Sequence, residues 1–236
     1  MTQIVSIIAT HQARIRCLLS QFLSRKIERF QNGSVVKLIV NSQNISINLI
    51  YSGELDEFKP ERKYYVTNED FNNEKYIKQS ESKFQPLQFP VELNNMANNY
   101  IPIEGSTTFV FYLVRHGQGT HNVLKGMAKK ISSISGEKDT HLTEKGIIQA
   151  GNTGNFLGST TDNGLTSIFN SKYLFISDLQ RTKETLASVL ANGQLMSGKT
   201  IHSNKMIMLP CSHELNYDKD GQCDGSYGQA MNANEN

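Results

Sequence analysis

The chain has 236 residues, with 24 Lys and Arg against 22 Asp and Glu and a formal net charge of +2. This length is enough to bury a substantial core in one α/β domain. Basic residues are scattered along the chain, which argues against a nucleic-acid surface. The three cysteines have neither metal-ligand nor disulfide spacing, and no apolar run reaches the length of a membrane span. We therefore expect a cytoplasmic protein without membrane association.

The first third of the chain predicts a compact strand and helix pattern. Residues 4–9 form an apolar run typical of a buried strand. Apolar residues then recur at three- and four-residue spacing from Ile15 to Phe30, which predicts an amphipathic helix that Gln31-Asn32-Gly33-Ser34 ends. Residues 35–40 and 45–51 predict two strands joined as a hairpin.

Residues 67–106 differ in composition from what precedes them. The segment is polar and Asn-rich and contains three prolines, although residues 69–82 could form one helix. Extended chain spans roughly 3.3 Å per residue, so a segment of this length can cross a whole domain. We interpret it as a connector.

The rest of the chain alternates between strand and helix. Strands are predicted at residues 107–114, 173–176 and 205–209, and helices at residues 142–157 and 179–190. Residues 218–236 are rich in Gly and Asn and predict a loop that becomes a loose tail. This alternation predicts an α/β fold, a three-layer α/β/α sandwich with a mainly parallel central sheet.

Chemistry-bearing residues follow four of the predicted strands. The strand before Arg115-His116-Gly117 is the clearest case, and His11, Arg181 and Glu214 come after three other strands. The carboxyl ends of parallel strands share one edge of a sheet, where ligands bind, so these residues can converge. Arg offers a planar fork for phosphate, and His is a nucleophile that titrates near neutral pH. The pattern indicates phosphoryl transfer through a phosphohistidine.

Several segments resemble motifs of the histidine phosphatase superfamily, the phosphoglycerate mutase-like proteins. They are Leu-Val-Arg-His-Gly-Gln-Gly-Thr-His-Asn at 113–122, Leu-Thr-Glu-Lys-Gly-Ile-Ile-Gln-Ala at 142–150, Ser-Asp-Leu-Gln-Arg-Thr at 177–182, and Leu-Pro-Cys-Ser-His-Glu-Leu at 209–215. The segment that carries the family's second histidine normally comes last. Here the matching pattern, Thr-His-Gln-Ala-Arg-Ile-Arg-Cys-Leu-Leu, stands at 10–19. The chain is therefore interpreted as a circularly permuted member of the family.

Permutation implies one domain over residues 1–236. Residues 1–66 would be the displaced carboxyl-terminal portion with the second histidine, residues 67–106 the connector, and residues 107–236 the amino-terminal portion. The alternative is that residues 1–66 are a fragment left by tandem duplication and packed elsewhere. Permutation requires the strand at 4–9 to lie parallel and close to the strand at 109–114.

The resemblance implies a role for each matched residue. His116 is the nucleophile, His11 the second histidine on the phosphate, and Glu214 the general acid and then base. Phosphate-binding residues are Arg115, Arg181, Asn122 and His11, while possible substrate contacts are Gln118, Gly119 and His213. Asn122 could instead cap a helix. His121, His141 and His202 are expected to be structural or exposed.

These roles predict a phosphomonoesterase that needs neither a metal ion nor a cofactor, because no carboxylate and histidine cluster has ligand spacing. The substrate would be a phosphorylated small molecule or a phosphoprotein, with no nucleic-acid partner. Two alternatives stay open: a phosphoglycerate mutase-type phosphotransferase, and a non-catalytic pseudo-phosphatase that binds phosphorylated ligands. Gln118-Gly119 and the lack of longer inserts favour hydrolysis over mutase activity.

Overall fold

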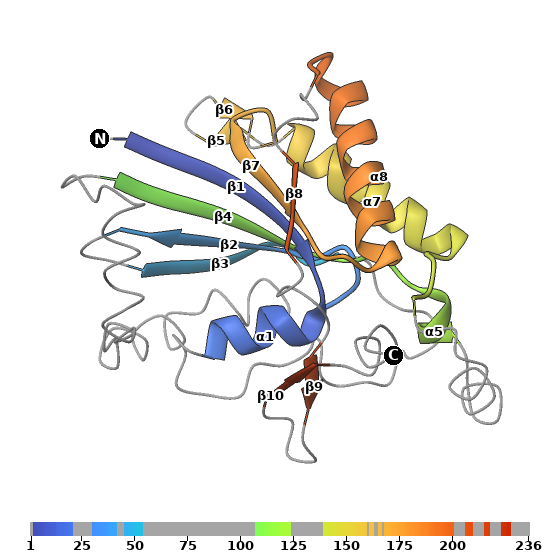
Figure 1. Cartoon of the computed structure of the whole chain (residues 1–236). Coiled ribbons are helices and arrows are strands. Elements are labelled where there is room, and N and C mark those ends of the chain that lie inside the picture. Colours follow the sequence, from blue (N-terminus) through green and yellow to red (C-terminus); the bar gives the residue numbers. More distant parts are fainter. Residues whose placement is uncertain are drawn as a thin grey trace.

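A six-stranded sheet forms the centre of the protein in a computed structural model (Figure 1). The structure describes residues 2–20, 30–41, 45–53, 107–123, 139–159, 161–162, 165–166, 168–200, 206–209, 215–217 and 223–227. The strands of the sheet are β1 (Thr2–Thr10), β2 (Val35–Val40), β3 (Ile45–Tyr51), β4 (Thr107–Arg115), β7 (Ser171–Ile176) and β8 (Met206–Met208). The protein is therefore a mixed α/β protein, as its sequence predicts.

The sheet has the strand order β3-β2-β4-β1-β7-β8. Parallel pairs join β4 to β1, β1 to β7 and β7 to β8, whereas β2 is antiparallel to both β3 and β4. The expectation of a mainly parallel sheet is thus corrected to a mixed sheet. The short connection at residues 41–44 accounts for the antiparallel pair of β2 and β3, because a parallel pair needs a crossover of a dozen or more residues. Strand β2 also joins β4 in the antiparallel direction.

Strand β1 lies between β4 and β7, although it precedes both by more than 100 residues. Its register with β4 runs without interruption from Thr2 opposite Thr107 to Thr10 opposite Arg115. On its other side, Ala9 lies opposite Ile176. The prediction that the strands at 4–9 and 109–114 lie parallel and adjacent is confirmed by the pairing of β1 with β4. It brings the residues after β1, β4 and β7 to one edge of the sheet.

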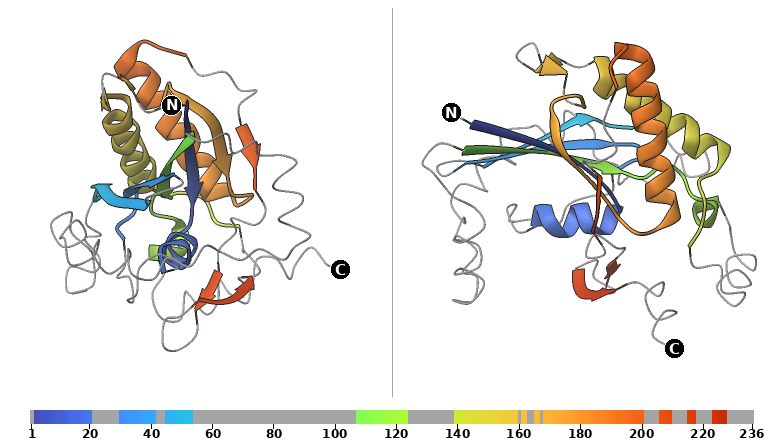
Figure 2. Two further views of the ribbon diagram at one scale, coloured as in Figure 1. Left: turned by 90° about the vertical axis from the view of Figure 1, so that its left-hand side faces the viewer. Right: turned by 45° about the horizontal axis from the view of Figure 1, so that its top comes forward.

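Described helices cover both faces of the sheet (Figures 1 and 2). Helices α7 (Glu144–Ser159) and α8 (Gln180–Ser197) pack on one face, and α1 (Gln12–Ser20) packs on the other. Each face has its own apolar cluster. Val114 of β4 belongs to the cluster with α7 and α8, and Leu113 belongs to the cluster with α1. This division follows from the alternation of side chains along a strand.

Most predicted elements are found close to their expected bounds. Helix α1 is described to Ser20, and residues 21–29 of the predicted helix lie outside the described part. The same holds for the connector at 67–106, including the possible helix at 69–82. Among the described helices, none has the length and apolar character needed to cross a membrane.

Three small features complete the description. They are the short helix α5 (Thr120–Val123), the pair β5 (Thr161–Asp162) and β6 (Leu165–Thr166), and the antiparallel pair β9 (Leu215–Tyr217) and β10 (Cys223–Tyr227). Strand β10 lies within the segment predicted to be loop and tail, so that prediction was wrong for residues 223–227. Short strands in a Gly- and Asp-rich segment carry too little apolar alternation to be predicted.

Candidate active site

Two buried histidines meet where β1 and β4 end. Because Thr10 and Arg115 are register partners, the next residues, His11 and His116, emerge side by side. Their ring centroids are 5.1 Å apart in an edge-to-face arrangement. His116 N donates to Thr10 O at 3.0 Å, and both side chains are almost fully buried. The sheet therefore places together two imidazoles that are far apart in the sequence.

The backbone after His116 determines which of its ring nitrogens carries the proton in the neutral form. His116 Nδ1 lies 2.6 Å from Gly117 O. A carbonyl can only accept, so Nδ1 carries the proton and Nε2 holds the lone pair of the neutral ring. A Cβ at residue 117 would lie 2.2 Å from Gly146 O, which excludes any other residue in this turn. The turn thus leaves the lone pair of the neutral His116 ring on Nε2.

Thr185 connects this turn to Arg181. Its hydroxyl accepts a hydrogen bond from Gly117 N at 3.0 Å and donates one to Arg181 O at 2.7 Å. Thr185 is fully buried, one helical turn after Arg181 on α8. It lies just beyond the Arg motif, but nothing in the sequence alone shows that its hydroxyl reaches the turn after β4. It links the backbone of Arg181 to the turn that follows His116.

A loop at residues 30–34 holds Arg115 and His116 from the other side. Arg115 Nη1 donates to Phe30 O, and Asn32 Nδ2 donates to His116 O at 3.2 Å. The backbone adds two further bonds, from Gly33 N to Arg115 O and from Arg115 N to Ser34 O. From the sequence, this segment predicts only the end of a helix. It also supports the site.

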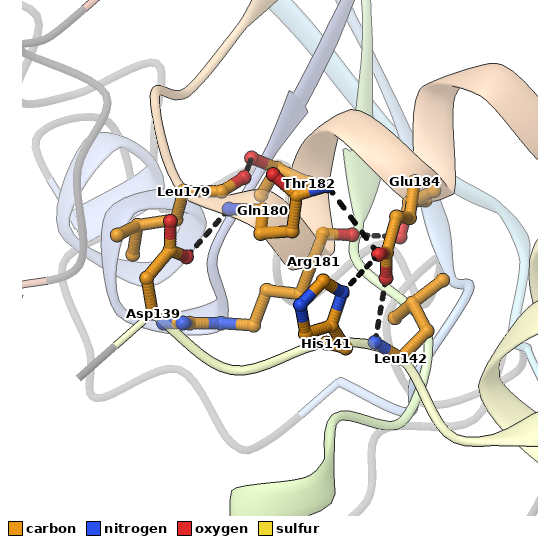
Figure 3. A network of polar contacts seen from close by, with 9 residues as sticks. Asp139, His141, Leu142, Leu179, Gln180, Arg181, Thr182 and Glu184 are labelled. Atoms are coloured by element: carbon orange, nitrogen blue, oxygen red, sulfur yellow. Dashed lines mark hydrogen bonds and ion pairs between the residues drawn. The ribbon is translucent and has the colours of Figure 1, made fainter. Parts of the chain in front are cut away.

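Arg181 lies in the first turn of α8 and is 5 % exposed. The helix has no side-chain cap from Leu179, its N-cap residue. Instead Asp139 Oδ1 accepts from Gln180 N at 2.6 Å, so a distant carboxylate serves the orphan amide of the helix start. In Figure 3 the Arg181 side chain runs along the side of α8 on which Asp139 and His141 lie.

A second carboxylate, Glu184, ties the same loop to α8 (Figure 3). Its two oxygens lie 2.5 Å from His141 Nδ1 and 2.7 Å from Leu142 N. Burial raises the pKa of Glu184, but hydrogen bonds from Leu142 N, His141 and Gln180 lower it more, so the pKa is below its ordinary value. His141 itself is 63 % exposed. The loop at 139–142 is thus fastened to α8 on both sides of Arg181.

The residues after His116 are held by internal hydrogen bonds. Gln118 is buried, and its Oε1 accepts from Thr143 Oγ1 at 2.9 Å. Asn122 Oδ1 accepts from Gly119 N at 2.9 Å, which is the helix-capping role that the sequence left as an alternative. The structure therefore places Gln118 and Gly119 beside the nucleophile turn and shows structural contacts for both.

Other expected site residues lie outside the described residues. These are Glu214 and His213. His202 and the side chain of His121, which were expected to be structural or exposed, also lie outside the described part. Of the proposed set, the structure brings together His11, Arg115, His116 and Arg181 around one strand edge. Within the described ranges, no group of three His, Cys, Asp or Glu residues is placed to hold a metal ion.

Comparison with known proteins agrees with this geometry. Residues 111–200 match the model of the histidine phosphatase superfamily (branch 1). No match was found among curated proteins or among solved structures. The matched segment contains Arg115, His116 and Arg181, and its β4 and β7 border the strand that delivers His11. Residues 111–200 of the chain are therefore similar to the histidine phosphatase superfamily.

Proposed function

We propose that the protein is a phosphomonoesterase that works through a phosphohistidine on His116. The match of residues 111–200 to the superfamily supports phosphatase or mutase-type phosphoryl transfer. The observation that carries the proposal is the pair of buried imidazoles 5.1 Å apart, with His116 Nδ1 bonded to Gly117 O. The bond to Gly117 O leaves the lone pair of His116 on Nε2. The neighbouring His11 ring can donate a hydrogen bond to the phosphate that His116 attacks.

The first half of the reaction transfers the phosphoryl group to the protein. His116 Nε2 attacks phosphorus, the bond from phosphorus to the ester oxygen breaks, and Glu214 gives its proton to the departing oxygen. Arg115, Arg181 and His11 neutralise the charge on the three other oxygens, which is most of what this chemistry asks of a protein. Asn122, His213, Gln118 and Gly119 are proposed to lie around the substrate.

The second half releases phosphate. Water attacks the phosphohistidine, the Glu214 carboxylate takes its proton, and the bond from phosphorus to Nε2 breaks to give orthophosphate and free His116. Each group returns to its starting state. In this scheme the positive side chains do the work that a metal ion does elsewhere, so we propose that neither a metal nor a cofactor is needed.

The architecture supports a proposal about the whole chain as well. We infer one circularly permuted domain over residues 1–236, a three-layer α/β/α sandwich in which residues 1–66 supply the second histidine. The support is the insertion of β1 between β4 and β7. A duplicated fragment packed elsewhere would leave β4 and β7 without the strand that joins them.

Rapid quench with a phosphomonoester labelled in the phosphoryl group tests the proposal. We expect an acid-labile, base-stable phosphoprotein in the wild type and in a His141→Ala control, and neither label nor turnover in His116→Ala. Turnover should persist with a chelator present. Phosphoglycerate isomerisation with a bisphosphate primer should be negligible beside hydrolysis. Full activity of His116→Ala would falsify the assignment, and isomerisation that exceeds hydrolysis would favour a mutase.

A further inference from the structure

The two histidines of the site have different hydrogen-bond partners. His116 Nδ1 faces the neutral carbonyl of Gly117. His11 Nε2 instead lies 3.1 Å from Ser177 Oγ, and that hydroxyl donates to Asp178 Oδ1 at 3.3 Å. A chain of two hydrogen bonds thus leads from His11 to the Asp178 carboxylate.

Proton counting fixes the direction of this chain. A serine hydroxyl has one proton, and here it points to the Asp178 carboxylate, which as an anion can only accept. The oxygen of Ser177 must then accept from His11, so His11 Nε2 carries a proton. Ser177 is fully buried and is held by its backbone as well, because its N–H donates to Ala9 O at 3.3 Å and its carbonyl accepts from Thr182 Oγ1 at 3.1 Å.

We propose that Ser177 and Asp178 are positioning residues that keep His11 protonated on Nε2 and favour its imidazolium form, while His116 stays neutral. Neighbouring groups would thereby separate the two imidazoles into one donor and one nucleophile. An imidazolium has N–H groups on both nitrogens, so His11 can bond Ser177 through Nε2 and still offer Nδ1–H to a phosphate oxygen. The catalytic meaning of this division rests on the proposed function.

The charges around His11 make such a device necessary. Among the described residues, the charged and titratable groups on the neighbouring elements include His116 and Arg115 where β4 ends and Asp178 just before α8. They also include Arg181, Lys183 and Glu184 in the first turns of α8, and Arg14 and Arg16 on α1. The positive charges of these arginines and the second imidazole oppose a further positive charge on the buried His11 ring. Asp178 supplies negative charge, and Ser177 carries its effect to the ring.

The test is ¹⁵N NMR of the full chain, with the His11 signals assigned from His11→Gln. We expect the wild-type His11 ring to carry its proton on Nε2. In Asp178→Asn and in Ser177→Ala, the His11 titration midpoint should move to lower pH by about one unit. It should stay in place in Asp178→Glu, and in Glu144→Gln, which removes a carboxylate from the exposed first turn of α7.

The same shift should appear in the alkaline limb of kcat/KM against pH, which a purely structural role would not move. A wild-type ring protonated on Nδ1 alone overturns the proposal. So does a His11 midpoint that is unchanged in both Asp178→Asn and Ser177→Ala. The NMR measurement needs no substrate, so its outcome is independent of whether His116 forms a phosphohistidine.

Discussion

Residues 107–200 contain the family match, whereas residues 2–53 lie outside it, yet the two regions supply neighbouring strands of one sheet. The matched region provides β4 and β7, which do not pair with each other because β1 lies between them. It also provides Arg115, His116 and Arg181. The outer region provides His11 and the loop that holds Arg115. Sequence similarity thus marks only one part of a candidate site to which both regions contribute residues.

Removing the outer region should have the largest effect. A chain that begins at residue 54 loses β1, so β4 and β7 each lose their shared neighbour and the apolar cores lose one wall. We expect no cooperative unfolding transition by circular dichroism and no phosphatase activity. Moving residues 1–66 behind Asn236 should instead retain both, because β1 can still reach its place. Loss of folding in the rearranged chain and full activity in the truncated chain would each contradict the comparison.

A smaller change can test the loop alone, and the chain offers a matched pair of glycines. Gly33 has φ +74° and a Cβ there would lie 2.9 Å from Thr153 Oγ1, whereas Gly198 has φ +67° and nothing within 4 Å. Alanine at either position must adopt a left-handed conformation, which at Gly198 should lower the free energy of unfolding by about 1 kcal/mol. Gly33→Ala should lower the free energy of unfolding by roughly twice as much, because of the close contact with Thr153. It should also lower kcat/KM, since Gly33 N donates to Arg115 O.

Urea unfolding and steady-state kinetics of the two variants measure this difference. Gly198→Ala should keep the wild-type kcat/KM, because it changes only the end of α8. Equal kinetic losses in the two variants would show that strain in the backbone, and not the contact with Arg115, controls activity.

The smallest expected effect concerns Glu184, which joins α8 to the loop at 139–142 within the matched region. The pKa of Glu184 in the folded protein is below the ordinary value of 4.5. Its contribution to stability is therefore present above that value and is lost as pH falls through the folded pKa. Glu184→Gln should lower the free energy of unfolding by about 0.5 kcal/mol at pH 7, and by less at pH 3.

Chemical denaturation at the two pH values checks this, with Glu144→Gln as a control for the loss of one charge. A Glu184→Gln deficit that is as large at pH 3 as at pH 7 would mean that packing, and not ionisation, accounts for the contribution of Glu184. Either result leaves the role of residues 2–53 untouched, so the regional comparison is tested separately.

Strong local patterns account for what the sequence predicted. The hairpin at 35–40 and 45–51 matches β2 and β3 because dense apolar, β-branched runs flank a short polar turn. Helix α8 was predicted to end near Leu190, where the apolar period ends. It continues to Ser197 with Leu195 82 % exposed, and Gly198 in the left-handed conformation ends it. A glycine after the last turn was the available signal.

Contacts between distant segments could not be predicted in this way. Asp139 bonds the amide of Gln180, and Phe30 O accepts from Arg115, only because the completed sheet brings these segments together. Polar contacts of this kind between distant segments produce neither a periodic pattern nor a compositional bias in the sequence. The convergence of His11 and His116 was predictable because each follows a strand, and strand ends in a parallel pair share an edge.

The position of β1 has a consequence for the order of folding. During synthesis, β1 emerges before β4, and its register partners lie more than 100 residues later in the chain. Its apolar side chains therefore remain without their native strand partner until β4 has been synthesised, while the local hairpin of β2 and β3 can form early. An unpaired apolar strand is prone to non-native pairing and aggregation. From this topology we expect closure of the sheet around β1 to be a slow step of folding, with the two histidines coming together in that step.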